Sequence, residues 1–160
     1  MGKTAYGAGA FALILLGALA AAASPIPSGP LVPFVTVAKG TTSDVHTPIR
    51  LTIHDPESWG RLWMQIMAPG HRPPAVDFGR DMVIALSPGP APEPAVLTIT
   101  RITRVPGRLV VWYTLRQTRP LPEGGGAGMS APFHVVRLAR SPLPVEFVFL
   151  KTPPILRPLP

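Results

Sequence analysis

One segment decides the fold of this chain: Asp55-Pro56-Glu57-Ser58-Trp59-Gly60-Arg61-Leu62-Trp63-Met64-Gln65-Ile66-Met67. Its large apolar side chains recur at i, i+3, i+4, i+7 and i+8, which aligns them in one stripe along a helix. Asp55 can cap the first N–H groups, and Pro56 fits the first helical position. Pro69 and Gly70 end the helix. A cofactor-gripping stripe is the alternative, but core packing is favoured, because most of the following chain predicts strands.

Seven other segments have the composition and period of β-strands. They span residues 34–38, 47–54, 82–86, 96–105, 108–118, 133–140 and 145–150. Segment 47–54 alternates apolar and polar side chains, which predicts one face toward the core and one toward water. Segment 82–86 is apolar on both faces and predicts a strand in the middle of the sheet. We therefore expect an α+β domain with a mainly antiparallel seven-stranded sheet packed by one amphipathic helix.

Residues 96–118 predict a β-hairpin. Pro106 and Gly107 match the central positions of a type II turn, where glycine adopts the required positive φ at little cost. In the second strand, Leu109, Val111, Tyr113 and Leu115 should face one side, and Val110, Trp112, Thr114 and Arg116 the other. In the first strand, Leu97 and Ile99 are out of phase with Ile102, which predicts a bulge near Thr100 and Arg101.

Both ends of the chain differ in composition from the middle. Residues 1–23 have a positive start at Lys3, a short apolar run and a closing alanine triplet, which is typical of a secretory signal peptide. Residues 24–33 predict a loose Pro/Ser-rich spacer, 34–151 the folded domain, and 152–160 an extended Pro-rich tail. We expect a secreted or periplasmic protein of the cell envelope. An uncleaved leader that associates the domain with the membrane is the alternative.

Composition excludes several classes of site. The chain has no cysteine, so it has no disulfide, thiol nucleophile or cysteine-ligated metal. Lys and Arg number 15 against 8 Asp and Glu, a formal net charge of +7. The arginines are scattered singly rather than clustered, which favours a solvated basic surface over nucleic-acid binding.

No catalytic, cofactor or metal site emerges from the titratable residues. The four histidines, His46, His54, His71 and His134, lack zinc-ligand spacing and are expected on the surface or in turns. Asp77 and Asp81 could form an acid–base pair, but local capping by Asp77 and screening by an arginine are favoured. The glycine run at residues 124–128 lacks a Lys-Ser/Thr ending and predicts a flexible loop rather than a phosphate cradle.

Three segments in order resemble the protease complex subunit PrcB family. They are the strand and helix Arg50-Leu51-Thr52-Ile53-His54-Asp55-Pro56-Glu57-Ser58-Trp59-Gly60-Arg61-Leu62-Trp63, then Val76-Asp77-Phe78-Gly79-Arg80-Asp81-Met82-Val83-Ile84-Ala85, and finally Ser130-Ala131-Pro132-Phe133-His134-Val135-Val136. The likeness covers about residues 35–149. One departure is Glu93-Pro94-Ala95-Val96-Leu97, where the family has a Gly-Gly-Tyr-like stretch.

The resemblance implies an exported, non-catalytic domain that assists the maturation or stability of a secreted subtilisin-type protease. It carries no catalytic residues to this chain. A docking role requires an exposed sheet edge or apolar patch, for which the loops 87–94 and 120–132, together with the arginine-bearing hairpin, are the candidates. Two alternatives stay open: an envelope domain that binds anionic polymer or lipid through its arginines, and an exported hydrolase that uses Asp77, Asp81 and a histidine.

Overall fold

Residues 29–91, 94–118 and 130–151, which the computed structural model describes, form two β-sheets and one helix. The elements are β1 (Phe34–Gly40), β2 (Ile49–Ile53), α1 (Pro56–Ile66), β3 (Asp81–Ser87), β4 (Ala95–Val105), β5 (Arg108–Gln117), β6 (Phe133–Ala139) and β7 (Val145–Phe149). The expected signal peptide 1–23, the start of the spacer and the tail 152–160 lie outside these ranges.

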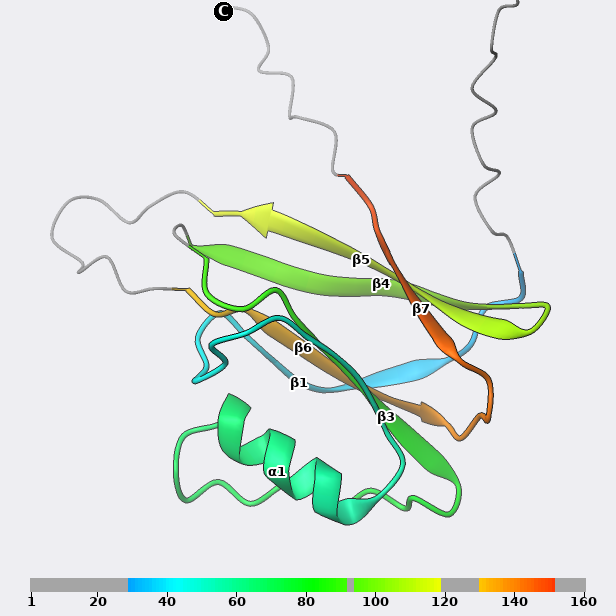
Figure 1. Cartoon of the computed structure of the whole chain (residues 1–160), viewed down its shortest axis with the longest axis horizontal. Helices are drawn as coiled ribbons and strands as arrows, with labels where there is room; N and C mark the ends of the chain where they lie inside the picture. The colour runs from blue at the N-terminus through cyan, green and yellow to red at the C-terminus, as the bar shows by residue number, and fades with distance from the viewer. Residues whose placement is uncertain (1–28, 92–93, 119–129, 152–160) are drawn as a thin grey trace, which may run out of the picture.

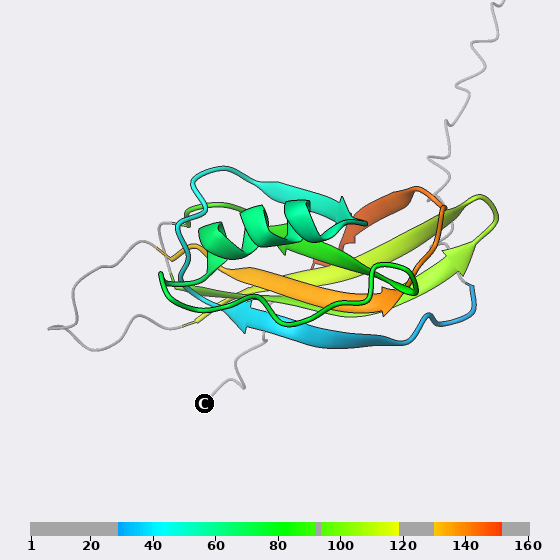
Figure 2. The same ribbon diagram turned by 90° about the horizontal axis from the view of Figure 1, so that it is seen from below.

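The elements stack in three layers (Figures 1 and 2). A four-stranded sheet, in the order β1-β6-β3-β2, lies between the helix and a three-stranded sheet, in the order β4-β5-β7. All strand pairs are antiparallel except β5 with β7, which is parallel. Within the described ranges, the α+β class, the one helix and the mainly antiparallel strands are confirmed, but the seven strands divide into two sheets rather than forming one.

The middle sheet is apolar on both faces, which explains this division. In β3, Val83 and Ala85 pack toward the helix, together with Val135 of β6. The alternate residues of β3 and β6 pack against the inner faces of β4 and β5 in a second core: Met82, Ile84, Leu86, Val136 and Leu138. A strand that is apolar on both faces needs a layer on each side, and the three-stranded sheet supplies the second one.

Helix α1 covers the middle sheet as expected. Asp55 caps it by accepting from the N–H of Ser58 at 2.7 Å, and Pro56 occupies the first turn. Trp59 and Trp63 are buried and meet edge to face, with their ring centroids 5.1 Å apart. Their indole N–H groups donate to the carbonyls of Pro74 and His71 at 3.0 and 2.8 Å. The same two side chains that pack the core therefore also hold the segment from His71 to Pro74 alongside the helix.

Residues 29–33 correct the expectation of a loose spacer. Leu31 forms a bridge with Thr103 on the edge of β4. The N–H of Val32 donates to the carbonyl of Ile102 at 2.8 Å, and the N–H of Arg104 donates to the carbonyl of Pro30 at 3.0 Å. This segment belongs to the folded domain because it supplies backbone partners to one half of an edge strand.

The hairpin β4–β5 has the turn and the bulge that the sequence predicts. Gly107 has φ +78°, the conformation that a type II turn requires. Ile99 pairs with Tyr113 and Arg101 with Trp112, so Thr100 is the extra residue. Because of this bulge, the apolar side chains on both sides of it reach the same inner core: Leu97, Ile99 and Ile102.

Alternation in β2 is confirmed only in part. Ile53 is buried and Ile49 half-buried against the helix-side core. Leu51, however, is 44% exposed. Because β2 is the edge strand of its sheet, an inward-directed side chain can lie beyond the cover that the helix provides.

Candidate functional site

Asp77 and Asp81, the two carboxylates considered as an acid–base pair, have separate structural partners. Asp77 Oδ1 accepts from the N–H of Gly79 at 3.0 Å, and the Asp77 carbonyl accepts from the N–H of Asp81 at 2.7 Å. The Asp81 carboxylate lies 3.6 Å from the Arg137 guanidinium. Local capping by Asp77 is therefore confirmed.

Three of the histidines lie at the surface or at element ends. His46 and His71 are exposed, and the ring of His71 contacts the carbonyl of Ala68 at 3.1 Å. His54 follows β2, and its Nδ1 is buried without a hydrogen-bond partner in the described part of the chain. Within residues 29–91, 94–118 and 130–151, no group of three or more His, Asp or Glu side chains is placed to hold a metal ion.

His134 is buried between the two sheets, so its expected surface position is wrong. It is 3% exposed, its Nδ1 accepts from the N–H of Ile99 at 2.8 Å, and its Nε2 lies 2.9 Å from Thr36 Oγ1. Because Nδ1 must be unprotonated to accept, Nε2 carries the proton and donates to Thr36. Burial, and secondarily the charge of Lys39, lowers the pKa of His134 to about 4. This residue therefore joins three strands as a neutral ring.

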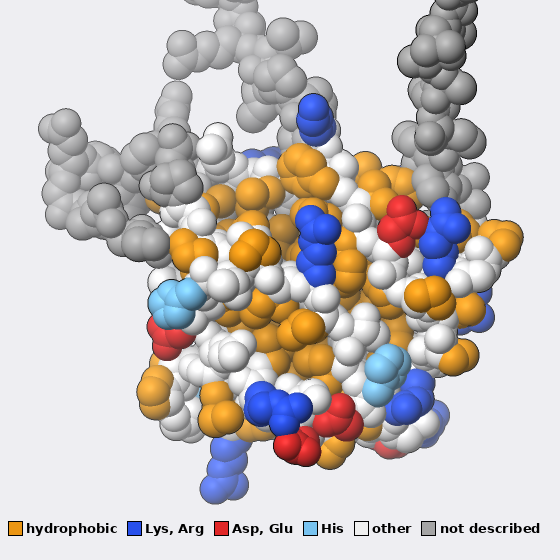
Figure 3. Space-filling model, in the orientation of Figure 1, with side chains coloured by type: hydrophobic (Ala, Val, Ile, Leu, Met, Phe, Trp, Pro, Cys, Tyr) orange, Lys and Arg blue, Asp and Glu red, His pale blue; other side chains and the backbone are white. Residues whose placement is uncertain are grey.

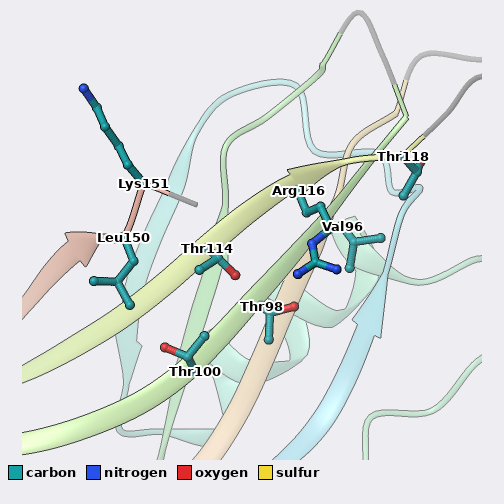
Figure 4. Close-up of a pocket in the computed structure, with 8 residues that line it drawn as sticks. All are labelled: Val96, Thr98, Thr100, Thr114, Arg116, Thr118, Leu150 and Lys151. Carbon is teal, nitrogen blue, oxygen red and sulfur yellow. The ribbon is translucent and has the colours of Figure 1, made fainter. Parts of the chain in front are cut away.

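A groove lies on the outer face of the three-stranded sheet (Figure 4). It has a volume of about 840 Å³ and is lined from β4, β5 and the end of β7 by Val96, Thr98, Thr100, Thr114, Arg116, Thr118, Leu150 and Lys151. Thr98 and Thr114 are direct cross-strand partners. Strand alternation places Thr114 and Arg116 on this face, as the sequence predicts, because Tyr113 and Leu115 occupy the inner core.

Trp112 lies on the outer face of β5, two residues before the groove-lining Thr114. It is 2% exposed, and the Arg101 guanidinium lies over its ring at 4.5 Å. Its indole N–H donates to Thr103 Oγ1 at 3.0 Å. A small apolar cluster with Val105 and Val110 surrounds it. The outer face is thus apolar and closed at one end, and hydroxyl-rich and open at the other.

An incompletely paired backbone edge borders the groove. β7 pairs with β5 only as far as Tyr113, whose carbonyl accepts from the N–H of Leu150 at 2.8 Å. β5 continues to Gln117, and there β4 is its partner on the other side. Alternate residues of a strand direct their backbone groups to the same side, so Leu115 and Gln117 direct theirs to the side that β7 has left. No described residue pairs with them there.

Charges around the groove are of one sign. Arg116 and Lys151 line it, and no Asp or Glu is among its lining residues. In Figure 4, the Arg116 side chain reaches toward Thr98 and Val96, whereas Lys151 points away from the sheet. This arrangement can bind an extended backbone segment that brings a carboxylate.

The two loops expected to dock a partner are partly buried in their described portions. Ser87 is buried as the last residue of β3, and the N–H of Ala91 donates to the carbonyl of Ser130 at 2.6 Å. Ser130 and Ala131 are buried and both donate to the carbonyl of Thr41, each at 3.0 Å. Residues 92–93 and 119–129 lie outside the described ranges. Of the predicted docking elements, the hairpin offers the groove.

The alternation of side chains in β5 predicted its two faces correctly, but no pattern in the sequence indicated the groove. The missing information was the pairing of β7, because its parallel addition to β5 and its early end cannot be inferred from periodicity. The buried role of His134 was also missed. A polar residue between the apolar Phe133 and Val135 was the available signal for it.

Comparison of the chain with protein-family models, with curated proteins and with solved structures gives no match. Among the helices in the described ranges, none combines the length and the apolar character that a membrane crossing demands.

Proposed function

We propose that this protein is an exported, non-catalytic accessory protein that binds an extended segment of a partner protein in the groove on the outer face of β4 and β5. The observation that carries the proposal is the edge of β5 at residues 114–117, which has no described partner on the groove side. An added strand would satisfy the backbone groups of Leu115 and Gln117, while its alternate side chains enter the groove.

The resemblance to the PrcB family supports a secreted subtilisin-type protease as the partner. Arg116 and Lys151 favour an acidic residue in the bound segment, because the groove lining contains no carboxylate to neutralise them. Apolar contacts at Val96 and Leu150 would supply burial.

Binding of an anionic polymer or lipid through the arginines is the less favoured function. On the side of the molecule that Figure 3 shows, the basic side chains form separate spots, interleaved with hydrophobic and acidic side chains, rather than one continuous patch. An exported hydrolase is also less favoured, because Asp77, Asp81 and His134 have separate structural partners.

The test is a binding titration with a purified, catalytically inactivated subtilisin-type protease that is co-produced with this protein. Gln117→Pro removes an N–H from the open edge, and Thr114→Trp fills the groove beside it with a bulky uncharged side chain. We expect each variant to weaken binding by about tenfold or more, the loss that a few missing interface contacts produce. Met64→Arg, at a 72% exposed position on the helix, is the matched control and should retain binding.

Unchanged affinity in both groove variants would refute the groove as the docking site. Salt dependence separates the two binding hypotheses, because partner docking that includes apolar contacts should weaken little between low and physiological salt. A steep loss with salt, together with binding to anionic polymer, would instead favour the polyanion function.

A further inference from the structure

A second hollow lies where β2 and β6 end and β3 begins, and its residues take no part in the groove. It has a volume of about 590 Å³ and is lined by His54, Gly79, Arg80, Arg140, Ser141 and Pro142. Three separate stretches of the chain meet here because β3 pairs with β2 on one side and with β6 on the other. Two arginines and no carboxylate line it.

Arg140 is fixed in place by backbone carbonyls rather than by an acidic side chain. Its Nη1 donates to the carbonyl of His54 at 3.1 Å and to that of Phe78 at 2.5 Å. Its backbone N–H donates to the carbonyl of Arg80 at 2.8 Å, which couples the two arginine-bearing segments. Nε and Nη2 of Arg140 have no hydrogen-bond partner in the described part of the chain. The guanidinium is therefore pre-positioned, with donors left for a ligand.

Neighbouring carboxylates have other partners, so they do not neutralise the two arginines directly. Asp55 accepts from the N–H of Ser58, Asp77 accepts from the N–H of Gly79, and Asp81 pairs with Arg137. Arg80 and Arg140 form no ion pair with any described acidic residue, whereas the ion pairs that are present involve Arg61, Arg108 and Arg137.

Ser141 and His54 add polar groups to this hollow. Ser141 is 3% exposed, and its Oγ accepts from the N–H of Leu143 at 3.3 Å, which leaves the hydroxyl proton to be donated. His54 lines the same hollow and contains the buried Nδ1 that lacks a described partner. The hollow thus contains polar groups, the Ser141 hydroxyl proton and His54 Nδ1, for which the described chain supplies no hydrogen-bond partner.

We infer that this hollow binds a phosphate group, held by the guanidinium groups of Arg80 and Arg140 with the Ser141 hydroxyl as a further donor. A phosphate dianion matches the two positive charges, and its tetrahedral oxygens accept from more donors than a carboxylate can. The inference does not depend on the proposed partner groove.

The experiment is an amide chemical-shift titration of the purified protein with inorganic phosphate, at an ionic strength held constant with sodium chloride. We expect saturable shifts centred on Gly79, Arg80 and residues 140–142. Arg80→Gln should weaken phosphate binding by about tenfold, the loss of one charge-assisted contact. Arg104→Gln removes an exposed charge from β4 and is the matched control, which should keep the wild-type affinity.

Two further arms identify the source and class of the ligand. Glycerol phosphate binding more tightly than inorganic phosphate would show that the site takes a phosphate monoester, and the reverse order would show that it takes the free ion. Acetate should bind much more weakly than either.

Shifts that fail to saturate, that scatter over all exposed arginines, or that persist unchanged in Arg80→Gln would overturn the site. Acetate binding as tightly as phosphate would overturn the assignment to phosphate. Arg80→Gln is preferred to Arg140→Gln because Arg140 also ties two backbone segments together.

Discussion

At the scale of single residues, the side chain of His134 takes the place of a neighbouring strand as the partner of Ile99 on the β4 edge. The N–H of Ile99 points away from β5, and a side chain from the other sheet satisfies it. A neutral ring is required for this bond, since protonated Nδ1 becomes a donor facing another donor. The stability of the packing between the two sheets therefore depends on the protonation state of this one imidazole.

We predict that acidification weakens the fold through His134. Its pKa is about 4 when folded and about 6.5 when unfolded, so the unfolded chain binds the proton more readily between these values. The stabilisation is complete above pH 6.5 and is lost as pH falls toward 4, amounting to about 3 kcal/mol in the free energy of unfolding. Urea titrations at pH 7, 5.5 and 4 measure it.

His134→Gln provides the comparison, because the amide can accept from Ile99 and donate to Thr36 without titrating. Over the same pH range this variant should lose about 3 kcal/mol less than the parent protein, whereas His46→Gln, at an exposed position, should behave like the parent. Parallel pH profiles for the parent and His134→Gln would show that this residue is not responsible. Lys39 is the charged group that acts on the ring, so Lys39→Met should raise the pKa of His134.

At the scale of elements, α1 depends on the cap at its first turn. The hydrogen bond from the N–H of Ser58 lowers the pKa of Asp55, so the carboxylate favours the folded state. Asp55→Ala should lower the urea midpoint at pH 7, and Asp55→Asn should lower it less, because the amide oxygen can still cap the helix.

The sign of the pH effect checks this mechanism. A carboxylate with a lowered pKa stabilises the fold above its ordinary value of 3.8, and the effect is lost as pH falls through the folded value. The difference between the parent and Asp55→Asn should therefore shrink in strong acid. A difference that stays constant from pH 7 to pH 2 would contradict the role of the ionised cap.

The bulge in β4 offers a second prediction at this scale. Deletion of Thr100 would restore plain alternation and turn Leu97 and Ile99 away from the core that Ile102 occupies. We expect a loss of about 3–6 kcal/mol in the free energy of unfolding, the cost of exposing two large aliphatic side chains.

Thr100→Ala is the control for the deletion. It keeps the extra residue and removes only the bond from Thr100 Oγ1 to the Trp112 carbonyl, at 3.1 Å, a cost of about 1 kcal/mol. Equal stability of the two variants would show that the phase of β4 does not matter.

Elements with a strong local signal were predicted to within a few residues. The cap at Asp55, the turn at Gly107 and the phase break at Thr100 each have a chemical cause within a short window of sequence. The assignment of each strand to one of the two sheets has no such cause. It depends on which strands pair over long separations, for example β1 with β6, and periodicity specifies only which faces are apolar.

At the scale of the whole molecule, the chain before β1 joins the two sheets. Residues 30–32 pair with the edge of β4 in the outer sheet, and the chain then enters β1 in the middle sheet. The composition of this segment predicted a loose linker, because Pro and Ser keep a chain extended and bury little surface. The carbonyl of Pro30 and the N–H of Val32 nevertheless provide backbone partners.

We predict that a chain beginning at Gly29 is more stable than one beginning at Phe34. The shorter chain loses two backbone hydrogen bonds at β4 and the packing of Val32, together about 3 kcal/mol in the free energy of unfolding. It also exposes an edge strand, so we expect it to self-associate at concentrations where the longer chain stays monomeric. Urea titration and light scattering measure the two effects, and equal values for both chains would refute the attachment.

The placement of the three tryptophans gives the molecule two built-in optical reporters. Trp59 and Trp63 are enclosed beneath the helix, whereas Trp112 lies on the far sheet under the Arg101 guanidinium. In Trp112→Phe, the remaining emission would follow only the docking of the helix. In a protein with both helix tryptophans changed to Phe, fluorescence would come from beside the groove alone. Tryptophan fluorescence can thus report the loosening of one outer layer without a contribution from the other.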